Sequence, residues 1–108
     1  MNLQFSTKFY SVMALPEDII TKVRRDFSED DALAILQLLA EFQIKNPDLS
    51  NRILRCIVFL AHGNFDEFAR AVAMARLDWR DLIVAAEYDG FSGEENRRRD
   101  FNLPFSTK

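Results

Sequence analysis

The stretch that decides the fold is LAHGNFDEFARAVAMARLDWRDLIVAAEYDG, residues 60–90. Gly63 follows an apolar run and predicts a helix end, because glycine enters the left-handed backbone conformation without a Cβ penalty. Asn64 predicts the start of the next helix, and Glu67, three residues later, completes the pattern of a capping box. A tight turn between two helices is therefore expected here.

A second helix start follows in the same stretch. Asp78 predicts an N-cap with Asp81 three residues later, and Gly90 predicts the helix end. Each of the two helices carries apolar side chains at helical spacing on one face. These faces are Phe65, Phe68, Ala69, Val72 and Ala75 in the first helix, and Trp79, Leu82, Ile83 and Ala86 in the second. The stretch predicts an αα-hairpin, the unit of helical bundles and superhelices.

Two helices are expected at the beginning of the chain. Pro16 suits a first helical position, and the helix should run to about residue 27. Ser28 then predicts the start of a longer helix over residues 29–46, which Pro47 ends. Apolar side chains cover most of this longer helix, so we expect it to be central, with neighbours on more than one flank.

Another helix is expected over residues 51–62, capped by Ser50 or Asn51. Beyond the hairpin, Ser92 and Glu95 favour a short helix that continues through Arg97–Arg99. No strand pattern competes, so the predicted fold is all-α, with about five helices in a short α–α superhelix or bundle. We expect one domain over residues 1–108, with an arm at 1–15 and a tail at 101–108.

Composition sets the class of protein. The chain has 108 residues, 48% hydrophobic residues and a net charge of −3, which is ordinary for a soluble globular domain and gives no general attraction to nucleic acid. The single cysteine, Cys56, has no partner for an internal disulfide and sits in an apolar run, where a buried inert thiol is expected. Neither a signal peptide nor a membrane span is predicted, so we expect a cytoplasmic protein.

The two ends of the sequence carry nearly the same seven residues. Residues 2–8, NLQFSTK, and residues 102–108, NLPFSTK, differ at a single position. A nucleotide-level duplication is one explanation, and two equivalent docking arms are the other.

The second half of the chain resembles a group of small bacterial helical proteins of uncharacterised function. The resemblance lies in Leu60-Ala61, Gly63-Asn64, the run DWRDLI at 78–83 and the run AEY at 86–88. It implies an α–α superhelix, loosely like armadillo or HEAT units but shorter than an array of them. It implies no activity.

The residues that could support catalysis are few. His62 is the only histidine, and no nucleophile stands beside it in the sequence. The spacing suits neither a zinc site nor a di-iron centre, and there is no glycine-rich phosphate loop. The sequence therefore predicts a protein that is not an enzyme and that has no cofactor, metal or catalytic residue.

Nucleic-acid binding has a superficial basis in the helix-turn-helix-like segment 53–76 and in the basic run Arg97–Arg99. The helix that would enter the groove begins with Asp66 and Glu67, however, and these carboxylates would face phosphates. The run Asp78-Trp79-Arg80-Asp81 looks specific, but capping by the aspartates and packing of the tryptophan account for it.

Two surfaces are candidates for partner binding. Arg52, Arg55, Phe59 and His62 share one edge of the helix over residues 51–62, and this edge should bind an acidic partner with Phe59 as its anchor. The alternative is that the arm at residues 1–15 covers Phe59. A secondary apolar surface is expected outside the main apolar faces, at Met74, Val84 and Tyr88.

The predicted function is a non-enzymatic protein-interaction, adaptor or regulatory domain, a description that includes a toxin-neutralising partner. The alternative is a nucleic-acid-associated regulator that uses segment 53–76. The expected partner is a protein, acidic at the site of contact. Association of two copies of the chain stays open, and no membrane partner is expected.

Overall fold

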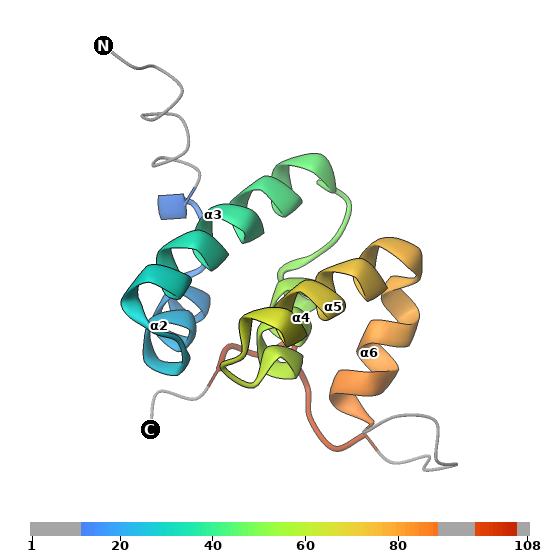
Figure 1. The fold of residues 1–108 in the computed structure, drawn as a ribbon. Coiled ribbons are helices and arrows are strands. Elements are labelled where there is room, and N and C mark those ends of the chain that lie inside the picture. Colours follow the sequence, from blue (N-terminus) through green and yellow to red (C-terminus); the bar gives the residue numbers. More distant parts are fainter. Residues whose placement is uncertain (1–11, 89–96, 106–108) are drawn as a thin grey trace.

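The computed structural model describes residues 12–88 and 97–105, and these residues form α helices and no strand (Figure 1). The five helices are α2 (Glu17–Asp26), α3 (Glu29–Lys45), α4 (Asn51–Ala61), α5 (Phe65–Leu77) and α6 (Trp79–Glu87). The predicted all-α fold is confirmed. No helix in this part of the chain combines the length and apolar character needed to cross a bilayer.

Side-chain caps begin three of the helices where the sequence predicts them. The Ser28 hydroxyl accepts a hydrogen bond from the Asp31 N–H, 3.2 Å away, at the start of α3. The Asn64 side chain accepts from the Glu67 N–H at 3.0 Å. These bonds satisfy backbone donors that have no partner inside the helix.

The other two starts differ in detail from the prediction. Pro16 precedes α2 rather than occupying its first turn, and the Ser50 side chain makes no cap hydrogen bond at the start of α4. Both positions still mark the helix boundary, since proline has no N–H to leave unsatisfied and the backbone at Ser50 is extended.

At the start of α6, Asp78 Oδ1 accepts a hydrogen bond from the Arg80 N–H at 2.9 Å. We predict that Asp78→Ala lowers the free energy of unfolding by about 1 kcal/mol, the usual contribution of an N-cap. Denaturant unfolding measures the change. Asp81→Ala is the matched control, because Asp81 lies in the same first turn and makes no cap bond. Equal losses in the two variants would assign the effect to helix-dipole charge instead of the cap.

The turn between α4 and α5 depends on glycine. His62 ends α4 with φ 48°, and Gly63 follows with φ 73°, so both lie in the left-handed region. A Cβ at Gly63 would stand 2.7 Å from the backbone oxygen of Asp26, at the end of α2. The predicted helix end at Gly63 is confirmed, and the turn also packs closely against a neighbouring helix.

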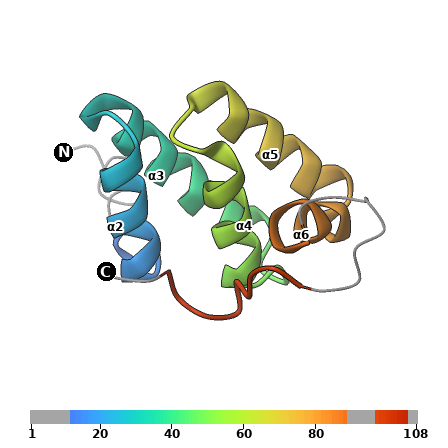
Figure 2. The same cartoon turned by 90° about the horizontal axis from the view of Figure 1, so that it is seen from below.

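The central helix is α4. Residues 53–58 are all buried, and α4 packs against α2, α5 and α6 (Figure 2). The prediction that the helix over residues 29–46 is central is wrong, because α3 packs chiefly against α2 and leaves Leu33, Leu38 and Ile44 exposed by 59%, 41% and 63%. An apolar circumference permits burial on every side, but here the neighbouring helices cover only part of it.

The segment from residue 97 crosses the molecule without regular structure. It runs along α4 from the end of α6 to α2, drawn in red (Figures 1 and 2). The helix predicted through Arg97–Arg99 is absent from these residues, and Phe101 is only 7% exposed, so residues 101–105 are not a free tail. Gly90, Ser92, Glu95 and nearly all of the predicted arm at 1–15 lie outside the described residues.

Candidate functional site

Arg55 of α4 is buried and held by α2. Its Nε and Nη2 donate to the two carboxylate oxygens of Asp18, at 2.9 and 3.2 Å. Its Nη1 donates to the backbone oxygen of Phe101 at 3.2 Å, and only 8% of the residue is exposed. Asp18 also accepts a hydrogen bond from the Phe105 N–H at 3.0 Å. This cluster therefore joins α2, α4 and segment 97–105.

Glu87 of α6 is the centre of a second cluster and is fully buried. Arg52 donates to both carboxylate oxygens, with Nε at 2.8 Å and Nη2 at 2.7 Å. Arg97 Nε adds a bond of 2.7 Å, and the Phe101 N–H adds one of 3.1 Å. All four lone-pair directions of the carboxylate are thereby engaged, which a buried carboxylate requires.

Both carboxylates stay ionised because of these partners. Burial disfavours the charged form of Glu87, but the hydrogen bonds from Arg52, Arg97 and Phe101 outweigh it and hold the pKa below 4.5. The pKa of Asp18 is held below 3.8 in the same way, with burial opposed by Arg55 and by the Phe105 N–H. The chain thus binds fewer protons at these groups when folded than when unfolded.

This difference predicts how stability depends on pH. A carboxylate with a lowered pKa contributes stability above its unfolded pKa, and the contribution is lost as the pH falls through the folded value. We expect the melting temperature to fall as the pH drops below about 4.5, the ordinary pKa of Glu87. Thermal unfolding from pH 7 to pH 3 measures it. Glu87→Gln should make the dependence shallower, and an unchanged dependence would contradict the assignment.

The predicted partner-binding edge is covered within the chain. Arg52 and Arg55 are engaged by Glu87 and Asp18, so the prediction that both arginines await an external acidic partner does not fit the structure. Phe59 is half-buried, with its ring 5.2 Å from that of Phe101. The helix spacing places the edge correctly, but the acidic residues that meet it come from α2 and α6.

The remaining contacts of this edge come from the same segment. The Arg99 guanidinium lies 4.5 Å from the centre of the Phe59 ring, and the ring of exposed His62 lies 5.2 Å from that of Phe59. Phe59 is therefore partly covered by segment 97–105. Residues 1–11, most of the arm named in the alternative, lie outside the described residues.

The predicted secondary apolar surface is only partly exposed. Met74 is 37% exposed, whereas Val84 on α6 and Tyr88, which follows α6, are half-buried. Instead, the corner between α5 and α6 exposes Leu77 by 89% and Trp79 by 42%, with the Arg80 guanidinium 5.6 Å from the Trp79 ring. Trp79 was expected to pack inside, and its position at the first turn of α6 leaves it at the surface.

A groove lies between α3 and α5, with a volume of about 230 Å³. Phe65 and Phe68 of α5 contribute to its wall, and Phe65 is 37% exposed although the sequence places it on the inner face. The residues that line the groove are Leu38, Glu41, Phe42, Lys45, Phe65, Phe68, Ala69, Val72, Ala73 and Arg76. No sequence motif predicted this groove. Its one signal was the excess of apolar side chains around residues 29–46.

Little in the described residues supports covalent or metal chemistry. No group of three or more His, Cys, Asp and Glu side chains in this part of the chain is placed to hold a metal ion. Cys56 is fully buried, and burial, together with the charge of Glu87, raises the pKa of its thiol to about 12. A thiol that stays protonated is a poor nucleophile, so Cys56 contributes to packing.

The fold and its clusters define a class of protein, an all-helical domain in which two buried carboxylate–arginine clusters join α2, α4, α6 and segment 97–105. Comparisons of the chain with protein-family models, with curated proteins and with solved structures found no match.

Proposed function

We propose that the protein is a non-enzymatic protein-interaction domain, and that the groove between α3 and α5 binds an amphipathic helix of a partner protein. The observation that supports the proposal is an apolar groove whose two walls come from helices that do not pack closely on each other. A helix laid into an apolar groove is a recurrent mode of recognition.

The exposure of the groove walls favours this function. Leu38 on α3 is 41% exposed and Phe65 on α5 is 37% exposed, while Phe42 and Phe68 below them are buried. A partner helix would cover the two exposed side chains without any rearrangement of the core. Exposed aromatic and aliphatic side chains that surround a hollow are typical of the anchor pockets of interfaces.

The charges at the groove indicate the polarity of the partner. Lys45 and Arg76 line the groove together with one carboxylate, Glu41. The partner helix should therefore carry an apolar stripe with acidic residues beside it, so that carboxylates meet Lys45 and Arg76. An acidic partner remains the proposal, and its site moves from the edge of α4 to this groove. A regulatory or toxin-neutralising role would be exercised through the same contact.

The nucleic-acid alternative receives less support. Arg52, Arg55 and Arg97 are paired with carboxylates of the chain, which removes much of the basic surface that phosphate binding needs. Asp66 and Glu67 lie in the first turn of α5, the helix that would have to approach the nucleic acid. Both features disfavour nucleic-acid binding by this surface.

Site-specific photo-crosslinking in the cells that make the protein tests the proposal. A photoreactive amino acid replaces Leu38 in the groove or, as a control, Leu33, an exposed leucine of the same helix that does not line the groove. We expect position 38 to capture a protein that position 33 does not capture, at a peptide that forms an acidic amphipathic helix. Equal capture at both positions, or capture through a non-helical peptide, overturns the proposal.

The captured protein then allows an affinity test with the same two positions. We expect Leu38→Glu to weaken binding at least about tenfold, because it places a charge in an apolar contact and beside acidic partner groups. Leu33→Glu should bind like the parent. Both leucines are exposed, so neither variant is expected to unfold the protein.

A further inference from the structure

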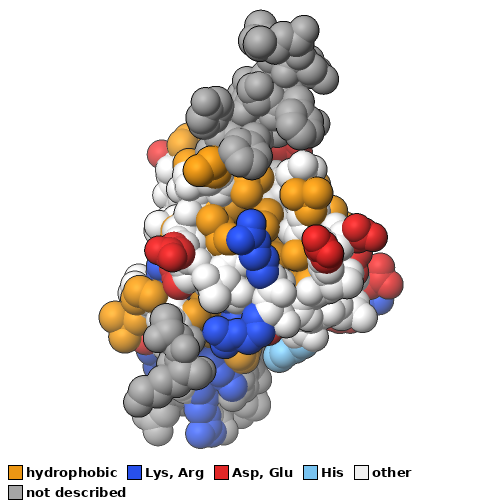
Figure 3. Space-filling model, turned by 90° about the vertical axis from the view of Figure 1, so that its left-hand side faces the viewer, with side chains coloured by type: hydrophobic (Ala, Val, Ile, Leu, Met, Phe, Trp, Pro, Cys, Tyr) orange, Lys and Arg blue, Asp and Glu red, His pale blue; other side chains and the backbone are white. Residues whose placement is uncertain are grey.

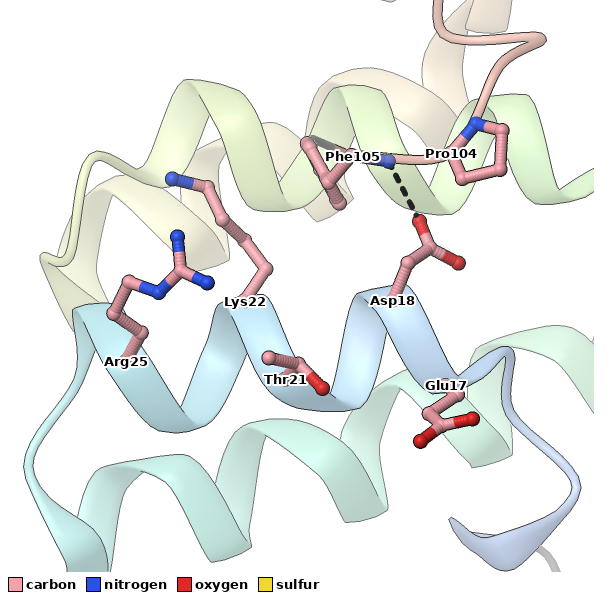
Figure 4. A pocket seen from close by; sticks show the side chains of 7 residues that line it. All are labelled: Glu17, Asp18, Thr21, Lys22, Arg25, Pro104 and Phe105. Atoms are coloured by element: carbon pink, nitrogen blue, oxygen red, sulfur yellow. Dashed lines mark hydrogen bonds between the residues drawn. The ribbon is translucent and has the colours of Figure 1, made fainter. Parts of the chain in front are cut away.

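Phe105 occupies a defined site on α2. Its N–H donates to Asp18 Oδ2 at 3.0 Å, and its ring lies 5.7 Å from that of Phe101 and 5.8 Å from Lys22 Nζ. Figure 4 shows this N–H pointing at Asp18, with Lys22 and Arg25 rising from α2 toward the same side. We call Asp18, Lys22 and Phe101 the Phe105 site. This site binds the backbone N–H and the aromatic ring of one and the same residue.

The site is built independently of the residue that fills it. Asp18 is held by Arg55, and Phe101 is held by Glu87 through its N–H and by Arg55 through its carbonyl oxygen. Release of the chain after Phe101 would leave this site in place. The space around Phe105 is only partly filled, since a cavity of about 430 Å³ borders Pro104 and Phe105. The face of the molecule drawn in Figure 3 carries hydrophobic side chains beside basic ones, with acidic side chains toward the edges.

The chain contains a second copy of the sequence that fills the site. Residues 2–8 repeat residues 102–108 except that Gln4 stands where the other copy has Pro104. Phe5 therefore follows Asn2 and Leu3 in the same order and spacing as Phe105 follows Asn102 and Leu103. The two features that the Phe105 site recognises, an N–H and the ring of the same residue, are present in both copies.

The single difference between the copies falls at a tolerant position. Pro104 is exposed, so a glutamine side chain there can extend into solvent. Proline does restrict the unbound chain, and loss of that restriction should weaken the copy at residues 2–8 by about two- to fivefold. Segment 2–8 is thus expected to be the weaker of the two ligands for this site.

Residues 2–8 are also tethered close to the site. Val12 is helical, and its backbone oxygen accepts a hydrogen bond from the Leu15 N–H at 3.1 Å, shortly before α2 begins. From Phe5 to Val12 the chain can span up to about 23–25 Å when extended. Asp18 is the second residue of α2 and Lys22 the sixth, and at a rise of about 1.5 Å per helical residue both lie within this reach. A short tether gives a local concentration of about millimolar, enough for a weak ligand to compete.

We propose that segment 2–8 of the same chain binds the Phe105 site in exchange with segment 102–105, with Phe5 taking the place of Phe105. The duplicated sequence then has a physical role, because α2 always carries one of the two segments. Departure of segment 102–105 leaves the rest of the fold closed and frees that segment for other contacts.

A double-mutant cycle in the full chain tests the exchange, with Phe5→Ala, Phe105→Ala and the combination. In the parent, Phe5→Ala should change the unfolding constant less than about twofold, because Phe105 holds the site. In the Phe105→Ala background the same change should raise the unfolding constant at least about fivefold, since Phe5 has become the occupant. An equally small effect in both backgrounds overturns the proposal. Phe9→Ala, outside the repeat, is the matched control and should be insensitive to the background.

Photo-crosslinking supplies a second measurement that does not depend on stability. A photoreactive phenylalanine analogue at position 5 of the Phe105→Ala chain should crosslink to α2, and the product should migrate as a monomer. The analogue at position 9 should not crosslink to α2. Absence of the crosslink from position 5 overturns the proposal, and a crosslinked dimer overturns the assignment to the same chain in favour of a second copy.

Discussion

Glu87→Ala is expected to lower the free energy of unfolding by about 3 kcal/mol, because loss of one partner from a buried ion pair leaves the remaining charges without compensation. Glu87 is fully buried and receives two hydrogen bonds from Arg52, one from Arg97 and one from the Phe101 N–H. The Arg52 and Arg97 side chains are 25% and 33% exposed, so they can regain some hydration. The loss should therefore lie at the lower end of the range for buried pairs.

Denaturant unfolding of the variant measures this loss, with Glu67→Ala as the control. Glu67 also pairs with an arginine, Arg70, but the two side chains are 45% and 74% exposed, and a solvent-exposed pair contributes at most about 1 kcal/mol. A loss below about 1 kcal/mol for Glu87→Ala would mean that the cluster does not secure segment 97–105.

The caps show what could be predicted from the sequence. Ser28, Asn64 and Asp78 each bond a backbone N–H two or three residues ahead, so all the information lies within one helical turn. Local sequence is sufficient for such contacts. The turn at Gly63 was predicted for the same reason, although its close approach to Asp26 was not, since Asp26 belongs to a distant part of the chain.

The arginine edge shows where local inference ends. Helical spacing correctly grouped Arg52 and Arg55, but their carboxylate partners, Glu87 and Asp18, are separated from them by 35 and 37 residues. No spacing rule joins residues so far apart. The absence of acidic side chains on the edge itself suggested an external acidic partner, whereas the fold supplies the acids. Lys45 and Arg76 line the same groove, and only the structure brings these two basic residues together.

The packing of α3 and α4 likewise depends on contacts that the local sequence does not reveal. The helix over residues 29–46 has more apolar positions around its circumference, yet α4 has the more complete burial. The number of apolar residues sets how much of a helix can be buried. The arrangement of the neighbouring helices decides how much of it is buried. The surplus on α3 appears as exposed leucines, one of which, Leu38, lines the proposed binding groove.

The variants Leu39→Ala and Leu33→Ala compare a packed position of α3 with an exposed one. Leu39 is fully buried, and its truncation should lower the free energy of unfolding by roughly 2–5 kcal/mol, because the transfer free energy of the lost methyl groups adds to the cost of the cavity. Leu33→Ala on the same helix is the control, and it should cost less than about 1 kcal/mol because Leu33 is 59% exposed. Chemical denaturation of both variants provides the comparison. Equal losses would mean that Leu33 is also packed, which would contradict the one-sided burial of α3.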